Sequence, residues 1–220
     1  THIQAKDAIA YVLPNIGKAI ANSKLCPVYA VSTTNLVGLA TLLDHIIEFA
    51  PDPAHHEAEH GKDEKGEPAS RKYADNEPFS AYCFRTVADP FAGRITYFKV
   101  MSGVLKNDAT LQNFTRSSSE RLQHVQVMQG KTATSVGELH AGDLGAVAKL
   151  KDTLTGDTLG DKSAAIHYPL PHIVEPSITF AVEPKTRADE DRIGPAIHKI
   201  LEEDPSLRFS RDPQTKEFLL

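Results

Sequence analysis

The stretch Ala141-Gly-Asp-Leu-Gly-Ala-Val-Ala-Lys-Leu-Lys-Asp-Thr-Leu-Thr-Gly-Asp-Thr-Leu159 decides how this chain is interpreted. Its largely apolar run at 144–150 predicts a buried strand, because a short apolar run bounded by turns is typical of one. A polar, glycine-containing turn flanks the run on each side, at 141–143 and 155–157. The stretch therefore predicts tightly turned β-structure in this part of the chain.

The same pattern extends outward, and residues 79–175 read as all-β. Runs rich in β-forming residues occupy 79–87 and 94–101, and shorter ones are expected at 109–114 and 122–128. Several short strands separated by glycine-containing turns favour a closed antiparallel barrel or a sandwich. The serines at 117–119 are expected to lie in a loop.

The flanking segments have a different character. Residues 1–50 predict helix, strand and helix, with a buried strand at 26–31, a helix start at 32–35, and an end before Pro51. This is one piece of an α/β domain. Residues 51–78 hold eight acidic and four basic residues with many prolines and glycines, which predicts an exposed acidic linker or long loop.

Residues 176–220 predict a β-α-β-β unit, the first half of a split β-α-β sandwich. A strand is expected at 177–182, and Thr186 with Asp189 three residues later is typical of a helix start. Pro195 falls inside the apolar periodicity of that helix, which predicts a kink or a late start. Two short strands should follow, at 207–210 and 217–220.

Composition excludes several classes of protein. The net charge of −5 over 220 residues argues against a generally basic nucleic-acid binder, and no apolar run approaches the length of a membrane span. Cys26 and Cys83 each lie in an apolar run, which favours two buried thiols over a disulfide. Free thiols in turn favour a cytoplasmic location.

One motif matches a zinc peptidase pattern. His56-Glu57-Ala58-Glu59-His60 has the H-E-x-x-H spacing, which needs a helix to bring both imidazoles to one metal ion. The surrounding prolines and glycines and the absence of an apolar stripe favour a solvated linker. No metal site and no catalytic residue are predicted.

An ordered series of short motifs resembles elongation factor G, a translational GTPase. The motifs are Asn76-Glu-Pro-Phe79, Asp89-Pro-Phe-Ala-Gly-Arg94, Val100-Met-Ser-Gly103, Arg121-Leu-Gln123, Ala141-Gly-Asp143, Thr155-Gly-Asp-Thr-Leu159, Glu183-Pro-Lys-Thr186 and Glu202-Glu-Asp-Pro205. The resemblance implies the C-terminal end of a G domain at 1–50, a linker at 51–78, the domain II β-barrel at 79–175, and the N-terminal half of domain III at 176–220. A ribosomal-protection factor or another paralogue shares these modules and stays an alternative.

The resemblance also implies sites. Ser32 and Thr33 lie where the family contacts guanine, although this chain has Val31-Ser32-Thr33 in place of Gly-Ser-Ala, and capping of a helix is the alternative role. The sequence holds neither a G-x-x-x-x-G-K-[ST] loop nor an Asn-Lys-x-Asp motif. GTP and magnesium are therefore expected only in a longer parent protein, and this segment is expected not to hydrolyse GTP.

The implied partner is the ribosome, chiefly small-subunit ribosomal RNA, and the implied activity of the parent is GTP-driven movement of tRNA and mRNA. This segment would dock on the ribosome and couple the domains, with no role at DNA or a membrane. Phosphate contacts are expected from cations near hairpin ends, with ordinary solvated charges as the alternative. These cations are Arg94, Lys99, Lys106, Arg116 and Arg121.

Overall fold

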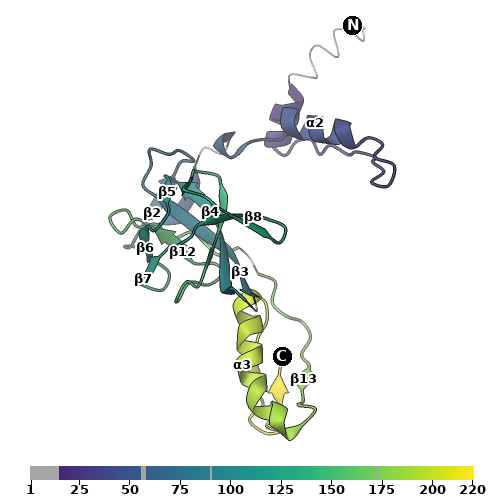
Figure 1. Cartoon of the computed structure of the whole chain (residues 1–220), viewed down its shortest axis with the longest axis vertical. Helices are drawn as coiled ribbons and strands as arrows, with labels where there is room; N and C mark the ends of the chain where they lie inside the picture. The colour runs from purple at the N-terminus through teal and green to yellow at the C-terminus, as the bar shows by residue number, and fades with distance from the viewer. Residues whose placement is uncertain (1–14, 56–57, 90, 172) are drawn as a thin grey trace. The chain divides into compact units, whose positions relative to one another are not determined.

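A computed structural model describes residues 15–55, 58–89, 91–171 and 173–220 of the chain (Figure 1). The chain divides into two compact units, Thr1–Glu57 and Ala58–Leu220. The larger unit holds the β-structure that the sequence predicts.

The main sheet of the larger unit is antiparallel and has eight strands in the order β7-β6-β12-β3-β4-β11-β8-β9. Alternate side chains of its central strands point into one apolar core, whose fully buried members include Phe98, Leu122 and Leu159. The strands are β3 (Ser80–Asp89), β4 (Gly93–Ser102), β6 (Thr110–Asn113), β7 (Ser118–Arg121), β8 (Gln126–Gln129), β9 (Thr132–Ser135), β11 (Leu144–Ala148) and β12 (Thr158–Gly160). A separate pair joins β5 (Leu105–Lys106) to β10 (Glu138–Leu139).

The structure is mainly β, as predicted, but the hydrogen-bonded ladder is open. Strands β7 and β9 end the order of the main sheet, and among the described residues no pairing joins one to the other. Closure into a barrel therefore stays a prediction.

Most predicted strands of this unit are present, and the differences have local causes. The strand expected at 144–150 ends at Ala148, because Lys149 adopts a left-handed φ of 64°. The prediction of a strand at 122–128 is wrong for its first half, because β8 starts only at Gln126. Before it, His124 has a left-handed φ of 55°, and the Asp108 N–H donates to the Leu122 carbonyl. Ser118 and Ser119 belong to β7 rather than to a loop.

The predicted exposed acidic linker or long loop contains an antiparallel hairpin, which the sequence did not indicate. Strand β1 (Glu59–Lys62) pairs with β2 (Pro68–Arg71), after a short 3-10 turn, η1 (Pro53–His55). The Asp63 carboxylate accepts backbone N–H bonds from Lys65 and Glu67, at 2.8 and 2.9 Å, and so holds the turn. Lys62 bridges to His167, which attaches the hairpin to the rest of the unit.

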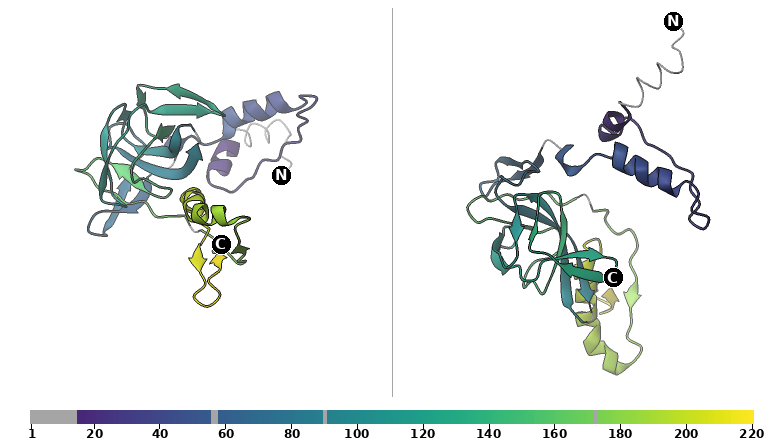
Figure 2. Two further views of the ribbon diagram at one scale, coloured as in Figure 1. Left: turned by 60° about the horizontal axis from the view of Figure 1, so that its bottom comes forward. Right: turned by 45° about the horizontal axis from the view of Figure 1, so that its top comes forward.

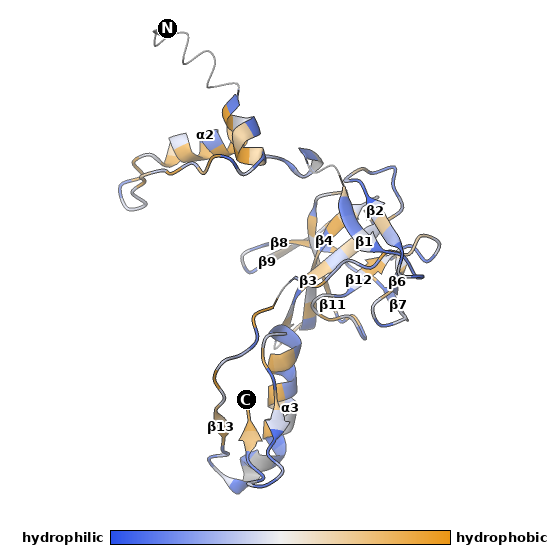
Figure 3. Ribbon diagram, turned by 180° about the vertical axis from the view of Figure 1, so that it is seen from behind, coloured by the Kyte–Doolittle hydropathy of each residue, from blue (hydrophilic) through white to orange (hydrophobic). Residues whose placement is uncertain are grey.

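The described part of the smaller unit contains two α-helical segments, at 15–21 and at α2 (Leu39–Phe49), and α2 carries many hydrophobic residues (Figure 3). The helix before Pro51 is confirmed, but its start is not at 32–35. It begins after Gly38, whose φ is 75°. The strand expected at 26–31 is absent from the described part of this unit, where Val28 is 91% exposed. Cys26 is exposed, contrary to expectation, whereas Cys83 is buried.

The C-terminal segment has the predicted β-α-β-β order, and its strands lie beside the helix (Figures 1 and 2). Strands β13 (Ala181–Val182), β14 (Ser210–Arg211) and β15 (Phe218–Leu219) form an antiparallel sheet in the order β13-β15-β14. This is the order of half a split β-α-β sandwich.

The helix α3 (Arg187–Glu203) starts after Thr186, where the sequence places it. The Thr186 hydroxyl donates to the Asp189 carboxylate at 2.6 Å. Pro195 lies inside the helix, so the expectation of a late start is wrong. A kink at Pro195 stays a prediction.

Candidate nucleic-acid interface

Arg94, the first of the predicted phosphate contacts, lies at the start of β4 and is held by protein acceptors. Its guanidinium donates to the carbonyl oxygens of Leu150 and Lys151, at 2.8 and 2.5 Å. The same group lies 3.4 Å from the Glu202 carboxylate of α3, and the side chain is only 21% exposed. These bonds link β4, the segment after β11 and α3, and they leave Arg94 little freedom to meet an external phosphate.

Lys99 is also engaged within the protein. Its ammonium donates to the Tyr73 hydroxyl at 2.8 Å and lies 4.6 Å from the centroid of the Tyr73 ring. The Tyr73 hydroxyl in turn donates to the Glu59 carboxylate at 2.7 Å. Burial and the bond to Glu59 raise the pKa of Tyr73 well above its ordinary value, so the phenol stays protonated. The three side chains tie β1 to β4.

Arg116 pairs with a buried carboxylate. Its guanidinium lies 2.6 Å from Asp157, whose side chain is 3% exposed. The same carboxylate accepts bonds from the Asn113 amide and the Leu154 backbone N–H, both at 2.9 Å. A buried carboxylate needs such partners, so this pair serves the fold of the β12 region.

Arg121 and Lys106 remain exposed. The Arg121 side chain is 61% exposed, with one exposed ion pair to Asp108 at 3.6 Å. Lys106 lies in β5. Among the three predicted arginines, Arg121 has the most exposed side chain, against 21% for Arg94 and 39% for Arg116.

Arg121 lines a cavity of about 490 Å³ that we call the Arg121 groove. Its lining combines two cations, an imidazole and two amides with two alanines, and it contains no carboxylate side chain. The lining residues are Ala92, Arg121, Gln123, His124, Gln126, Ala148 and Lys149. Guanidinium, ammonium, imidazole and amide groups together are typical of a surface that holds phosphate.

The fold brings the members of this groove together across a strand pair. Gln126 opposes Ala146 in the pairing of β8 with β11, which places the segment before β8 near the residue after β11. His124 and Lys149 both have left-handed backbone conformations, with φ of 55° and 64°. Such conformations cost on the order of 1–3 kcal/mol in residues other than glycine and are found most often at functional sites.

Sequence reasoning missed His124 and Lys149. Nothing in the local sequence pattern connects His124 with Lys149. The left-handed turns and the β8–β11 register that unite them are tertiary features.

The predicted guanine loop has a different geometry from a helix cap. The Ser32 hydroxyl accepts the Asn35 backbone N–H at 3.3 Å, and Ser32 forms an isolated bridge with Val37. The tight turn between these bridge residues holds Thr33, which is exposed, and α2 starts only at Leu39. The capping alternative is therefore wrong, and guanine contact by Ser32 and Thr33 stays a prediction.

His56 and Glu57 of the H-E-x-x-H motif lie outside the described residues, while His60 lies in strand β1 rather than in a helix. Across the residues that are described, no three His, Cys, Asp or Glu side chains gather in a way that could hold a metal ion. A search of the same residues found no helix long and apolar enough to cross a membrane.

Comparisons with known proteins show which family the larger unit of the chain matches. Residues 78–162 match the family described as elongation factor G domain 2, and residues 173–220 match elongation factor G, domain III. The chain is also similar to a solved structure of a protein from Thermus thermophilus, with 28% sequence identity and a TM-score of 0.75. That match covers 99% of this chain and 30% of the Thermus chain.

Proposed function

Because this chain carries the second and third domains of an elongation factor G-like translation factor, we propose that it docks such a factor on small-subunit ribosomal RNA. The chain corresponds to less than a third of the Thermus protein that it matches. The activity of the whole factor is proposed by family likeness: GTP-driven movement of tRNA and mRNA, with the phosphates of GTP and the magnesium ion held outside this segment. Closure of the main sheet into a domain II barrel belongs to the same proposal.

The Arg121 groove carries the docking proposal. It offers Arg121 and Lys149 with His124 and no carboxylate in its lining, although Arg121 also has an exposed ion pair with Asp108 and the chain as a whole is acidic. A local cationic cavity on an acidic protein favours phosphate at one place rather than over the whole surface. Recognition of structured RNA by shape and phosphate contacts suits a groove of this kind.

A second role, coupling between domains, is supported by contacts between the main sheet and α3. Arg94 of β4 pairs with Glu202, and the Ala88 backbone N–H of β3 donates to the Glu203 carboxylate at 2.5 Å. Both acceptors lie in the last turn of α3. A movement of α3 would therefore displace the contacting residues of β3 and β4.

The docking proposal is tested by co-sedimentation of the chain with purified small ribosomal subunits. The test variant is the double substitution Arg121→Gln and Lys149→Asn, because asparagine tolerates the left-handed backbone at 149. Lys131→Gln is the matched control, since Lys131 is a lysine outside the groove lining. We expect the double variant to bind about tenfold or more weakly, and the control to bind like the wild type. Equal binding by all three proteins would refute the proposal.

The paralogue alternative concerns the whole factor rather than this segment. A ribosomal-protection factor or a non-hydrolysing ribosome-binding relative would use the same docking surface. Titration of the chain with a fluorescent GTP analogue checks the expectation that nucleotide binds elsewhere. Micromolar binding would contradict that expectation and would leave the docking result unaffected.

A further inference from the structure

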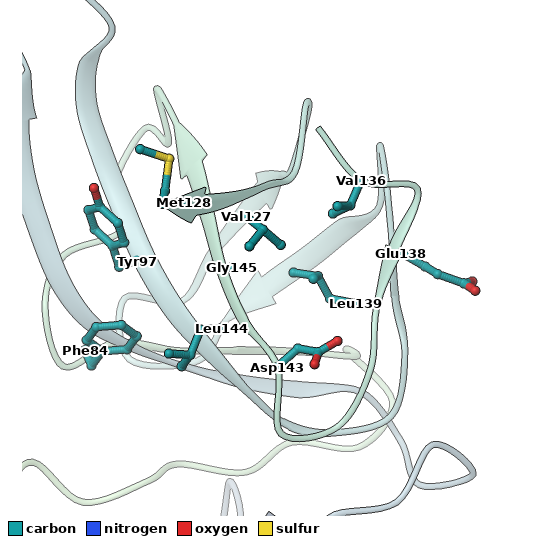
Figure 4. A pocket seen from close by; sticks show the side chains of 10 residues that line it. All are labelled: Phe84, Tyr97, Val127, Met128, Val136, Glu138, Leu139, Asp143, Leu144 and Gly145. Carbon is teal, nitrogen blue, oxygen red and sulfur yellow. The ribbon is translucent and has the colours of Figure 1, made fainter. Parts of the chain in front are cut away.

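Strands β8 and β11 separate soon after they meet, and an open groove lies between them. Their pairing contains only Ala146 with Gln126. An antiparallel register would continue with Val127 opposite Gly145 and Met128 opposite Leu144, but the described pairing stops before those residues. All four of these residues, which pair on their other sides with β9 or β4, line one cavity of about 530 Å³, which we call the Phe84 groove (Figure 4).

The interior of the Phe84 groove is apolar and accessible. Phe84 and Tyr97 contribute aromatic rings whose centroids lie 6.4 Å apart, and Figure 4 shows both on the same side as Leu144. Phe84 is 41% exposed, Val127 38% and Leu144 58%. Large apolar side chains gathered in one open cavity, rather than scattered singly, mark an interaction site. The cavity volume is in the range of ligand-binding pockets.

The charges at this groove are all negative. Glu138 and Asp143 are its charged lining residues, and neither lysine nor arginine lines it. Glu138 is about half exposed, and Figure 4 shows its carboxylate extending away from the apolar side chains. One Asp143 oxygen accepts the His140 backbone N–H at 2.8 Å. The His140 imidazole lies 3.6 Å from Glu138 and also contacts Asp75. With two carboxylates and neither lysine nor arginine in its lining, the groove favours a basic partner over the phosphates of RNA.

We propose that the Phe84 groove binds an extended, basic segment of a partner protein. An apolar side chain of that segment would insert among Phe84, Tyr97 and Val127, while flanking lysine or arginine side chains would pair with Glu138 and Asp143. The separated strand edges at β8 and β11 favour an extended backbone, since such edges can accept an added strand. This protein-binding surface differs in chemistry and location from the Arg121 groove, with which it shares no lining residue.

Methyl NMR of the whole chain tests the proposal with defined probes. The main probe is the acetylated, amidated pentapeptide Lys-Val-Lys-Val-Lys. Its comparison peptides are Glu-Val-Glu-Val-Glu, which reverses the charge, and Lys-Ser-Lys-Ser-Lys, which removes the apolar anchors. We expect the first peptide to shift the methyl resonances of Val127, Met128 and Leu144 in a saturable way, and each comparison peptide to bind about tenfold or more weakly.

Two variants connect that binding with the groove. Glu138→Lys should weaken binding of the basic peptide about five- to tenfold, by removing one attraction and adding a repulsion. Phe84→Ala should weaken it at least as much, because the aromatic anchor is lost. Glu64→Lys, a charge reversal in the β1–β2 turn, is the matched control and should bind like the wild type. An unchanged spectrum of the other methyl groups confirms that each variant is folded.

Three results would overturn the proposal. One is the absence of saturable shifts with the basic peptide, and another is equal binding of the acidic peptide. The third is a stronger response of the same methyl groups to oligouridylate, which would identify the occupant as RNA. Because the small-subunit docking variants leave this groove intact, failure here is distinguishable from failure of the proposed RNA docking.

Discussion

Substitution of Glu120 by glutamine should destabilise the larger unit more than its conservative shape suggests. Glu120 lies in β7 and is 4% exposed. Its carboxylate accepts backbone N–H bonds from Lys151, Asp152 and Thr153, at 3.0, 2.7 and 3.0 Å. It also accepts the Thr153 hydroxyl at 2.9 Å. The carboxylate thus fixes the segment whose carbonyl groups hold Arg94.

The expected magnitude follows from these bonds. Glutamine keeps one acceptor oxygen for the three bonds at Asp152 and Thr153, but its amide group faces the Lys151 N–H with a donor. A hydrogen bond to a charged group contributes about 1.5–3 kcal/mol, and the remaining three bonds lose their charge assistance. We therefore expect Glu120→Gln to lower the free energy of unfolding by about 2–4 kcal/mol at pH 7. The exposed control Glu138→Gln should change it by less than about 0.5 kcal/mol.

The effect of Glu120→Gln should depend on pH. Burial acts to raise the pKa of Glu120, but the hydrogen bonds from Asp152, Lys151 and Thr153 outweigh it and hold that pKa below its ordinary value. A carboxylate with a lowered pKa in the folded state contributes stability above its unfolded pKa, and that stability is lost as the pH falls through the folded value. The difference between wild type and variant should therefore shrink in acid, below about pH 4.

Urea unfolding measures this difference when it is followed at amide NMR signals of β3 and β4, which report on the larger unit. A difference below about 1 kcal/mol at pH 7 would refute the reasoning. An undiminished difference at about pH 3 would do the same, because it would show that the charge of Glu120 is not the source.

Three further predictions rest on local contacts. The hydrogen bond that His140 donates to the Asp75 carboxylate raises the pKa of His140, so His140 should titrate above an ordinary histidine by NMR. Asp75→Asn should lower that pKa, and an unchanged titration would contradict the contact. This pair contributes stability that is lost as the pH rises through the folded pKa of His140, and also as it falls through the lowered pKa of Asp75. Gly145→Ala should destabilise the larger unit by about 1–3 kcal/mol in urea unfolding, because its methyl group would overlap the side chains of Leu139 and Phe98, and a neutral result would exclude that crowding. Pro195→Ala should slow amide exchange in α3 by restoring a backbone donor, worth up to about 3 kcal/mol, whereas unchanged exchange would show that the helix tolerates the proline without cost.

The sequence indicated the parts of the fold in which local pattern and tertiary structure agree. The long hairpin of β3 and β4 combines β-forming residues with a glycine turn, and α3 begins directly after the predicted Thr186. The β1–β2 hairpin was missed because its strands are polar. Its support is tertiary: Lys62 bridges to His167, and Arg71 donates to the Ala164 carbonyl at 2.9 Å. Residues so far apart in sequence leave no periodic signal.

The candidate site was predicted only in part, for the same reason. Arg121 could be named as a cation near a hairpin end, and it does line a cationic groove. Nothing local distinguishes it from Arg94 or Arg116, whose acceptors lie tens of residues away at Leu150 and Asp157. The contribution of Lys149 depends on a left-handed turn that its own sequence does not favour.

The salt dependence of binding to small ribosomal subunits tests whether the Arg121 groove contacts RNA phosphates, because phosphate contacts release counterions. Each contact contributes roughly 0.7–0.9 to the slope of the logarithm of affinity against the logarithm of salt concentration. We expect the double variant Arg121→Gln, Lys149→Asn to lower this slope by about 1.4–1.8 relative to wild type, and Lys131→Gln to leave it unchanged. Equal slopes for the double variant and the wild type would show that the Arg121 groove does not contact the phosphates.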